Sequence, residues 1–220
     1  MKQNWYKWAA AILLLYTCWF GLMGEVPRKV ILNESIRNLY FHVPMWFGMI
    51  IILGASVWNS IKYLQTTQLS YDLKAESTAK VGLLFGILGL VTGMLWAQYT
   101  WGEWWSSDPK QNTSAIALLI YLAYLVLRGS FNENAQRARI GAVYNIFAFA
   151  ALIPLLFILP RLTDSLHPGN GGNPGFGAYD LDGRMRSVFY PAVLGWTFLG
   201  FWLANLRNRI HSIRNRYEEI

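Results

Sequence analysis

The side chains of this chain that could hold an iron group are two histidines together with a segment rich in tryptophan. His42 stands at the entrance to the second of six apolar runs, and His167 stands between the fifth and the sixth. The tryptophan-rich segment, residues 96–112, has the sequence WAQYTWGEWWSSDPKQN and holds four of the eleven tryptophans. Two neutral imidazoles from different parts of a chain can fill both axial positions of an iron porphyrin, and indole rings offer stacking area to its flat face. These residue types therefore indicate haem.

Readings without a ligand stay open on the residues alone. Tryptophan and tyrosine gather at membrane interfaces because an amphipathic ring suits the headgroup layer, and a single histidine there is often only a hydrogen-bonding polar residue. Asp108, Pro109 and Gln111 have the order of a helix start: an acid at the N-cap, a proline at the first helical position and a glutamine in the capping-box place. Asp108 could then serve only as a cap.

The elements that must position these residues are membrane-spanning helices. The chain of 220 residues is 54% hydrophobic and only 14% charged, a composition that a soluble domain could not bury. An apolar run of about 20 residues crosses a bilayer as a helix, because backbone groups inside hydrocarbon must be satisfied within the segment. Six runs occur, at about 8–24, 43–61, 81–99, 109–127, 140–159 and 188–206. We predict an all-α integral membrane protein, a single domain over 1–220 with six transmembrane helices and an outward-facing tryptophan-rich segment.

Six spans put both termini on the same side, and the basic residues indicate which side that is. With 62–80 counted as a loop, the side of the termini collects twelve Lys and Arg residues, whereas the other side has seven, balanced by seven acids. Lys and Arg are enriched in short cytoplasmic segments, so we expect both termini in the cytoplasm. The net charge of +7 then lies where anionic lipid attracts it, which makes the lipid bilayer the partner and leaves no need for nucleic acid.

Several protein classes do not fit this sequence. The lone Cys18 leaves no CxxCH for covalent haem attachment and no disulfide framework. A phosphate-binding G-x-x-x-x-G-K-[ST] loop is also absent, so the chain is not itself an ATPase. Bulky residues occupy the place of a signal-peptide cleavage site after the first run, which predicts a retained first helix. A b-type electron carrier is disfavoured because the six spans lack a histidine away from an interface.

Three short motifs, taken in order, resemble one known family. WGEWWSSDPK at 101–110 resembles the WWD signature, roughly W-G-x-W-W-x-W-D, of the haem-handling CcmC and CcsA proteins of cytochrome c biogenesis. YFHVPMWFG at 40–48 and SLHP at 165–168 resemble the histidine contexts of that family. Length and span count fit CcmC better than CcsA, whereas the DPKQN continuation is nearer to CcsA. Ser107 stands where the family usually has a third tryptophan.

The resemblance implies a ligand, a site and partners. The ligand is a b-type haem, held transiently and without covalent bonds, with His42 and His167 as axial ligands to the iron. The other implied cofactor-binding residues are Trp101, Gly102, Trp104, Trp105 and Asp108. The implied role is delivery of haem at the outer face of the bacterial inner membrane to a periplasmic haem chaperone of the CcmE type, with the transporter subunits CcmA and CcmB and the small CcmD as further partners. This is binding and transfer, so no enzymatic activity is expected.

Two further expectations concern haem contacts and release. Arg37, Arg161 and Arg184 are outward candidates for the haem propionates. The glycine-rich 168–177 stretch is expected to be flexible enough to let His167 leave the iron. The remaining alternatives are a CcsA-type haem exporter or synthetase component, and a permease or scaffold subunit whose aromatic segment binds a protein and no haem.

Overall fold

The computed structural model describes residues 4–29, 31–167 and 181–218, and all regular structure in these residues is helical. The six long helices are α1 (Trp5–Met23), α2 (Leu39–Thr66), α3 (Leu69–Trp101), α4 (Pro109–Gly129), α5 (Asn134–Ile153) and α6 (Gly183–Glu218). A 3₁₀ helix, η1 (Asn33–Asn38), leads into α2, and α5 continues into the π-helix η2 (Pro154–Ile158) and the 3₁₀ helix η3 (Leu159–Arg161). Within these described ranges, six helical segments are long and apolar enough to cross a membrane, which confirms the predicted all-α membrane fold.

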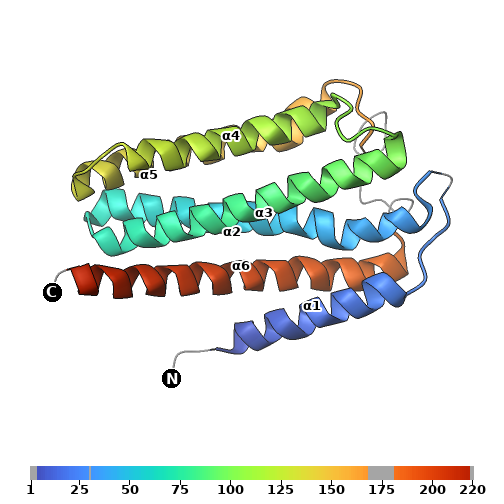
Figure 1. Cartoon of the computed structure of the whole chain (residues 1–220), viewed down its shortest axis with the longest axis horizontal. Coiled ribbons are helices and arrows are strands. Elements are labelled where there is room, and N and C mark those ends of the chain that lie inside the picture. The colour runs from blue at the N-terminus through green and yellow to red at the C-terminus, as the bar shows by residue number, and fades with distance from the viewer. Residues whose placement is uncertain (1–3, 30, 168–180, 219–220) are drawn as a thin grey trace.

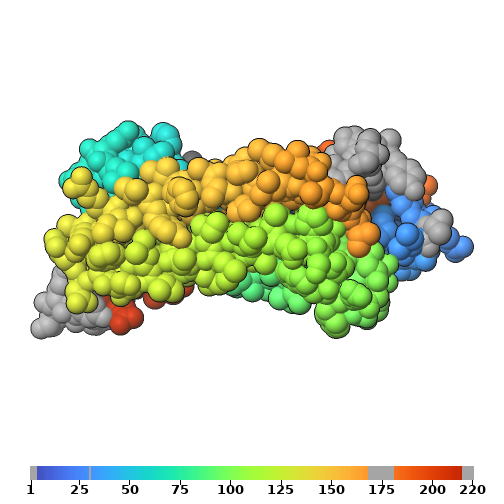
Figure 2. All heavy atoms as spheres, turned by 90° about the horizontal axis from the view of Figure 1, so that it is seen from above, coloured from blue at the N-terminus to red at the C-terminus, as the bar shows by residue number. Residues whose placement is uncertain are grey.

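The six helices run side by side along the long axis of the molecule (Figure 1). α2 and α3 occupy the middle, with α4 and α5 on one side and α6 and α1 on the other. Viewed from above, α4 and α5 cover one face together (Figure 2). Both chain ends lie at one end of the bundle, and the α1–α2 and α3–α4 connections lie at the opposite end (Figure 1). The tryptophan-rich segment and the start of α2, which carries His42, are therefore at the same end.

The helices extend beyond the apolar runs that predicted them. The predicted loop over 62–80 is wrong, because α2 continues to Thr66 and α3 begins at Leu69, which leaves only Thr67 and Gln68 between them. Thr67 ends α2 with a positive φ of 57°. Hydropathy detects the part of a helix that lies in hydrocarbon, whereas the polar first turns of α3 include Lys74, Ala75, Glu76 and Ala79, residue types that favour helix in water as well.

Small residues on α3 allow α2 to approach it closely. A Cβ atom at Gly82 would lie 2.6 Å from a side-chain carbon of Leu53, and one at Gly86 would lie 2.7 Å from the sulfur of Met49. Both partners come from α2 and are fully buried in the central core. Side chains of α2 thus pack directly onto the α3 backbone, the arrangement that small residues permit between membrane helices.

A buried ion pair joins α3 to α4 near the end of the bundle that carries the termini. The guanidinium of Arg128 donates to both carboxylate oxygens of Asp72, at 2.6 and 2.8 Å, and to Glu76 at 3.1 Å. Arg128 and Asp72 are both buried. A buried charge is tolerated only with such a partner, so this pair fixes the two helices relative to each other.

Candidate functional site

His42 lies in the first turn of α2 and is anchored to α3. Its Nδ1 atom is 2.9 Å from the carbonyl oxygen of Gly89 and 3.2 Å from the hydroxyl oxygen of Thr92. A carbonyl oxygen can only accept, so Nδ1 carries the proton and donates it. The lone pair of the neutral ring is then on Nε2, the nitrogen that can bind a metal.

The ring of His42 lies directly against the backbone of α3. A Cβ atom at Gly93 would stand 2.7 Å from Cε1 of this ring and 3.3 Å from Nδ1. Two indoles flank the imidazole edge-to-face: Trp96 with ring centroids 5.9 Å apart and Trp46 with centroids 6.4 Å apart. Glycine at 93 therefore provides the space that the ring occupies.

His167 is anchored to the residue that begins α4. Its Nδ1 atom lies 2.8 Å from a carboxylate oxygen of Asp108. The other carboxylate oxygen accepts from the backbone N–H of Leu166 at 2.7 Å and from the hydroxyl of Ser165 at 2.8 Å. Three consecutive residues, 165–167, are thus tied to a single carboxylate.

Asp108 is ionised in this setting and also caps a helix. Burial raises the pKa of Asp108, but the hydrogen bonds from His167, from the N–H of Leu166 and from the hydroxyl of Ser165 outweigh burial and hold the pKa well below its usual range. Its carboxylate accepts from the backbone N–H of Lys110 at 2.9 Å, which confirms the predicted N-cap. Because an ionised carboxylate only accepts, Nδ1 of His167 is the donor, and in the neutral ring the lone pair is then on Nε2.

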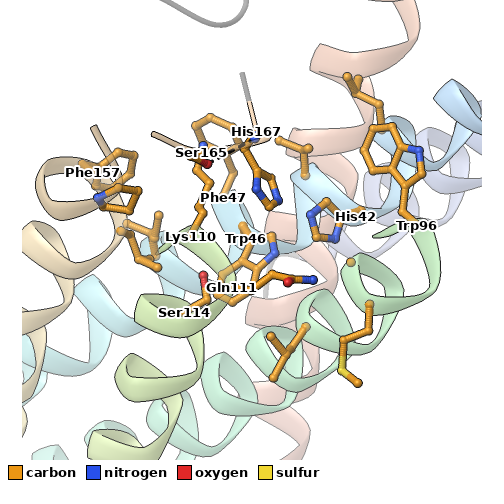
Figure 3. Close-up of a pocket in the computed structure, with 18 of the residues that line it drawn as sticks. His42, Trp46, Phe47, Trp96, Lys110, Gln111, Ser114, Phe157, Ser165 and His167 are labelled. Carbon is orange, nitrogen blue, oxygen red and sulfur yellow. Dashed lines mark hydrogen bonds between the residues drawn. The ribbon is translucent and has the colours of Figure 1, made fainter. Parts of the chain in front are cut away.

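Both histidines line the same cavity, which has a volume of about 220 Å³. That volume far exceeds the roughly 10–15 Å³ needed by one water molecule, so the cavity can admit a larger group. Figure 3 shows the two imidazoles entering it from different elements, with Trp46 and Trp96 nearby. Its aromatic and charged lining consists of His42, His167, Trp46, Phe47, Trp96, Phe157, Lys110 and Arg161. Most of the remaining lining is apolar side chains of α2, α3, η2 and neighbouring segments.

The tryptophans of the predicted WWD platform lie in different places. The indole of Trp101 contacts the imidazole of His167 edge-to-face, with ring centroids 4.8 Å apart. Trp104 and Trp105 are 53% and 37% exposed and do not line the cavity. Gly102 has a φ of 84° and ends α3, a conformation that glycine adopts without strain. Cofactor binding by Trp104, Trp105 and Gly102 stays a prediction.

The segment between α3 and α4 is held by the first turn of α4. The side-chain oxygen of Gln111 accepts from the backbone N–H of Ser106 at 3.0 Å. Asn112 accepts from the indole N–H of Trp105 at 3.1 Å and donates to the carbonyl oxygen of Ser107 at 3.0 Å. Gln111 therefore secures Ser106, two residues before the cap, in place of the capping-box contact expected from its position.

The three arginines predicted for haem propionates separate into two groups. Arg161 lines the cavity. Arg37 instead donates to the carbonyl oxygens of Gly21 and Gly24 at the end of α1, at 3.1 and 2.6 Å, and Arg184 pairs with Glu25. Neither Arg37 nor Arg184 lines the cavity. The glycine-rich stretch 168–177, predicted to be flexible, lies outside the described residues.

The sequence reasoning missed several residues that the structure brings to the cavity. Trp46 follows His42 by four residues, a spacing that puts both on one helix face, so this pair could have been found. Glycines at 82, 86, 89 and 93 repeat at helical spacing on α3, a second signal that was available. Lys110 gave no comparable signal, because its place at the cavity depends on how α4 packs.

This arrangement suits a planar ligand with a metal at its centre. Two imidazole nitrogens leave the equatorial positions of an iron to the four nitrogens of a porphyrin. Metal-binding histidines usually donate the other ring N–H to a carbonyl or a carboxylate, as His42 and His167 do here. The indoles of Trp46 and Trp96 and the apolar lining offer contact area to a porphyrin.

Comparison with known proteins gives consistent matches. The family model described as "Heme exporter protein C" matches residues 1–219. "Heme exporter protein C" of Escherichia coli (strain K12) is 24% identical over 211 residues, covering 94% of this chain and 80% of that protein. The protein of the same name from Paracoccus denitrificans is 26% identical, covering 96% and 83%. "Cytochrome c biogenesis protein CcsA" of Prochlorococcus marinus is 40% identical over 88 residues, 40% of this chain and 27% of that protein.

Proposed function

Because the chain belongs to the heme exporter protein C family, we propose that it binds haem at one end of its helical bundle and hands it on during cytochrome c biogenesis. The match to this family extends over nearly the whole chain, whereas the similarity to a CcsA protein covers 40% of it. The exporter C type is therefore the better-supported assignment. Binding and transfer, without catalysis, describe the proposed activity.

The observation that carries this proposal is the shared cavity of His42 and His167. The two side chains come from α2 and from the connection that follows η3, and both line one cavity. Each ring has its Nδ1 atom engaged by an acceptor, so each offers Nε2 as a ligand atom. Bound haem would supply the iron and its four equatorial nitrogens, and the two imidazoles would fill both axial positions, which suits carriage of haem better than oxygen chemistry.

The two ligands are held by different kinds of structure. His42 belongs to a long helix and contacts the backbone of another helix. His167 lies in a non-helical segment and is retained through Asp108. Since loops rearrange at lower cost than packed helices, we infer that His167 is the ligand that leaves when haem is transferred.

Two cations of the cavity are proposed to bind the haem propionates. Lys110 at the start of α4 and Arg161 in η3 both line the cavity. Carboxylates form their strongest hydrogen bonds with such charged donors. Arg161 keeps its predicted role in this proposal, and Lys110 takes the place of Arg37 and Arg184.

The same end of the bundle is proposed to face the periplasm. Both termini lie at the other end, on the side that the basic residues assign to the cytoplasm. Trp104 and Trp105 are exposed near the cavity end, where a CcmE-like haem chaperone could contact them. CcmA, CcmB and CcmD are proposed as the membrane partners, in a bacterial inner membrane.

The test is the absorption spectrum of the purified, detergent-solubilised protein loaded with haem. We expect a low-spin spectrum for the parent protein and its loss in both His42→Ala and His167→Ala. The matched control is His211→Ala, since His211 lies in α6 and does not line the cavity; it should keep the parent spectrum. Unchanged haem content in both cavity variants would refute the proposal.

A further inference from the structure

We propose that α3 positions both candidate ligands: Gly93 and Thr92 orient the imidazole of His42, and Trp101 orients the imidazole of His167. The inference rests on the proposed function, because it assigns roles toward the two histidines of the haem site. Gly93 lines the cavity beside His42, whereas Thr92 and Trp101 do not. All three are proposed to act through the histidines, as positioning residues.

The N–H of His42 meets two acceptors on α3. The carbonyl oxygen of Gly89 is 2.9 Å from Nδ1, and the hydroxyl oxygen of Thr92 is 3.2 Å from it. That hydroxyl lies within hydrogen-bond distance of the carbonyls of Leu88 and Gly89, at 2.8 and 3.0 Å, so its proton points to the backbone and its oxygen is left to accept. These two acceptor oxygens, 3.0 Å apart, together restrict rotation of the imidazole ring.

Gly93 fixes the position of the same ring by having no side chain. The three nearest atoms to a Cβ placed at Gly93 all belong to His42: Cε1 at 2.7 Å, Nδ1 at 3.3 Å and Nε2 at 3.5 Å. An alanine at this position would therefore push on the imidazole before any other group. The ring would turn away from α3 while the helices keep their packing, since a side-chain end yields more easily than a backbone.

Trp101 confines the ring of His167 from the same helix. Its indole meets the imidazole edge-to-face, with centroids 4.8 Å apart and planes at 75°. Asp108 holds Nδ1 of that imidazole, so a hydrogen bond fixes one ring atom and the indole restricts rotation about it. The first tryptophan of the WWD segment thereby contacts a ligand residue and not the cavity.

The common helix sets the distance between the two contacts. Gly93 and Trp101 are eight residues apart in α3, about 12 Å along the axis at 1.5 Å per residue. A continuous helix keeps this separation far better than the connections that carry His167. Sites held on rigid elements retain their geometry more closely than sites on loops, so α3 serves as the template for the pair of imidazoles.

The experiment measures haem affinity and the electron paramagnetic resonance signal of ferric haem in three variants and their controls. Gly93→Ala and Trp101→Leu should weaken haem binding about 10- to 100-fold, the usual effect of removing a group that orients a metal ligand, and should shift the low-spin g values. Thr92→Val should cause a smaller shift in the same direction, since Gly89 still accepts. Thr92→Ser keeps the hydroxyl and should restore the parent signal, as should Trp101→Phe, which keeps an aromatic ring.

Two matched substitutions control for effects on packing alone. Gly86→Ala makes the same change on the same helix but meets Leu118 and Met49 in the central core; it should lower the melting temperature without shifting the g values. Trp58→Leu removes an exposed tryptophan of α2 that does not line the cavity and should leave haem binding unchanged.

The inference and the proposed function fail in different ways. Parent-like haem affinity and g values in both Gly93→Ala and Trp101→Leu, with loss of haem in His42→Ala, would overturn the inference and leave the haem site intact. Retention of haem in His42→Ala and His167→Ala would overturn both. If Gly93→Ala does not accumulate, the comparison of Thr92→Val with Thr92→Ser decides for His42, and equal signals from that pair would count against the inference.

Discussion

The carboxylate of Asp108 and the imidazole of His167 form a hydrogen bond of 2.8 Å across 59 residues of sequence. The same carboxylate caps α4 through the N–H of Lys110 and accepts from Ser165 and Leu166. One side chain thus joins the start of a membrane helix to the segment that carries a candidate ligand. The position of His167 depends on the position of α4 for this reason.

Replacing Asp108 by asparagine should separate its two roles. Asparagine caps helices about as well as aspartate, so we expect the stability of the protein to change little. The neutral amide is a weaker acceptor for Nδ1 of His167 than the carboxylate, so haem affinity should fall on the order of 10-fold. Haem titration and thermal unfolding of the same preparation measure the two effects.

Asp108→Ala is the companion variant, because it removes both roles. Loss of the cap should lower stability by about 1 kcal/mol in addition to the loss of affinity. Equal haem affinity in Asp108→Asn and the parent protein would mean that the carboxylate acts only as a cap.

The two cavity cations, Lys110 and Arg161, should contribute to the affinity for haem but not to the affinity for its dimethyl ester, in which both propionates are blocked. We expect Lys110→Gln combined with Arg161→Gln to weaken binding of haem several-fold, because two charge-assisted hydrogen bonds are lost. Binding of the ester should hardly change, since it never made those contacts. Affinities for both ligands are measured by absorption titration.

Arg184→Gln is the matched control for the cavity cations. Arg184 is an outward arginine that pairs with Glu25 and does not line the cavity, so its removal should leave both affinities unchanged. A drop in haem affinity for Arg184→Gln, with none for the double variant, would instead support Arg184 as a propionate-binding residue, as the sequence analysis predicted.

The membrane fold could be predicted from the sequence, because every helix that crosses the hydrocarbon layer must have a certain length and an apolar composition. The fourth helix was predicted to begin at Pro109 and does so, because a cap residue and a proline specify a helix start locally. The start of α3 at Leu69 was missed, since hydropathy does not detect the polar turns of a helix beyond its apolar part.

The two histidines could be singled out from the sequence as candidate ligands. The residues that surround them in the structure could not. Histidine is rare in this chain, and His42 stands at the entrance to an apolar run while His167 stands between two such runs, so both could be named as candidate ligands. The acceptors Gly89 and Thr92 are common residues inside an apolar helix, and their role depends on which face α3 turns toward α2. Lys110 likewise reaches the cavity through packing that one sequence does not specify.

The buried ion pair of Arg128 and Asp72 should dominate the stability of the α3–α4 contact. Arg128→Met leaves the buried carboxylate of Asp72 unpaired and should lower the unfolding free energy by about 3–5 kcal/mol. Asp72→Asn should cost less, because Glu76 still pairs with Arg128. The double variant should cost less than the sum of the two, because the unpaired charge is then absent. Unfolding in detergent measures all three variants.

The exposed pair of Arg184 and Glu25 provides the comparison for the buried one. Its two side chains are 76% and 85% exposed, and surface pairs contribute about 0–1 kcal/mol. Glu25→Gln should therefore have little effect on unfolding. A small effect of Arg128→Met, similar to that of Glu25→Gln, would argue against a structural role for the buried pair.

The proposed orientation predicts which end of the bundle an impermeant thiol reagent reaches in spheroplasts. In a Cys18→Ala background, Glu103→Cys places a thiol in the exposed α3–α4 connection, and Asn132→Cys places one in the exposed α4–α5 connection. Because these connections lie at opposite ends of the bundle (Figure 1), only one can face the periplasm. We expect labelling of Glu103→Cys in spheroplasts and labelling of Asn132→Cys only after lysis, as the twelve basic residues on the side of the termini require. The reverse pattern would place the haem site on the cytoplasmic side and would exclude delivery to a periplasmic chaperone.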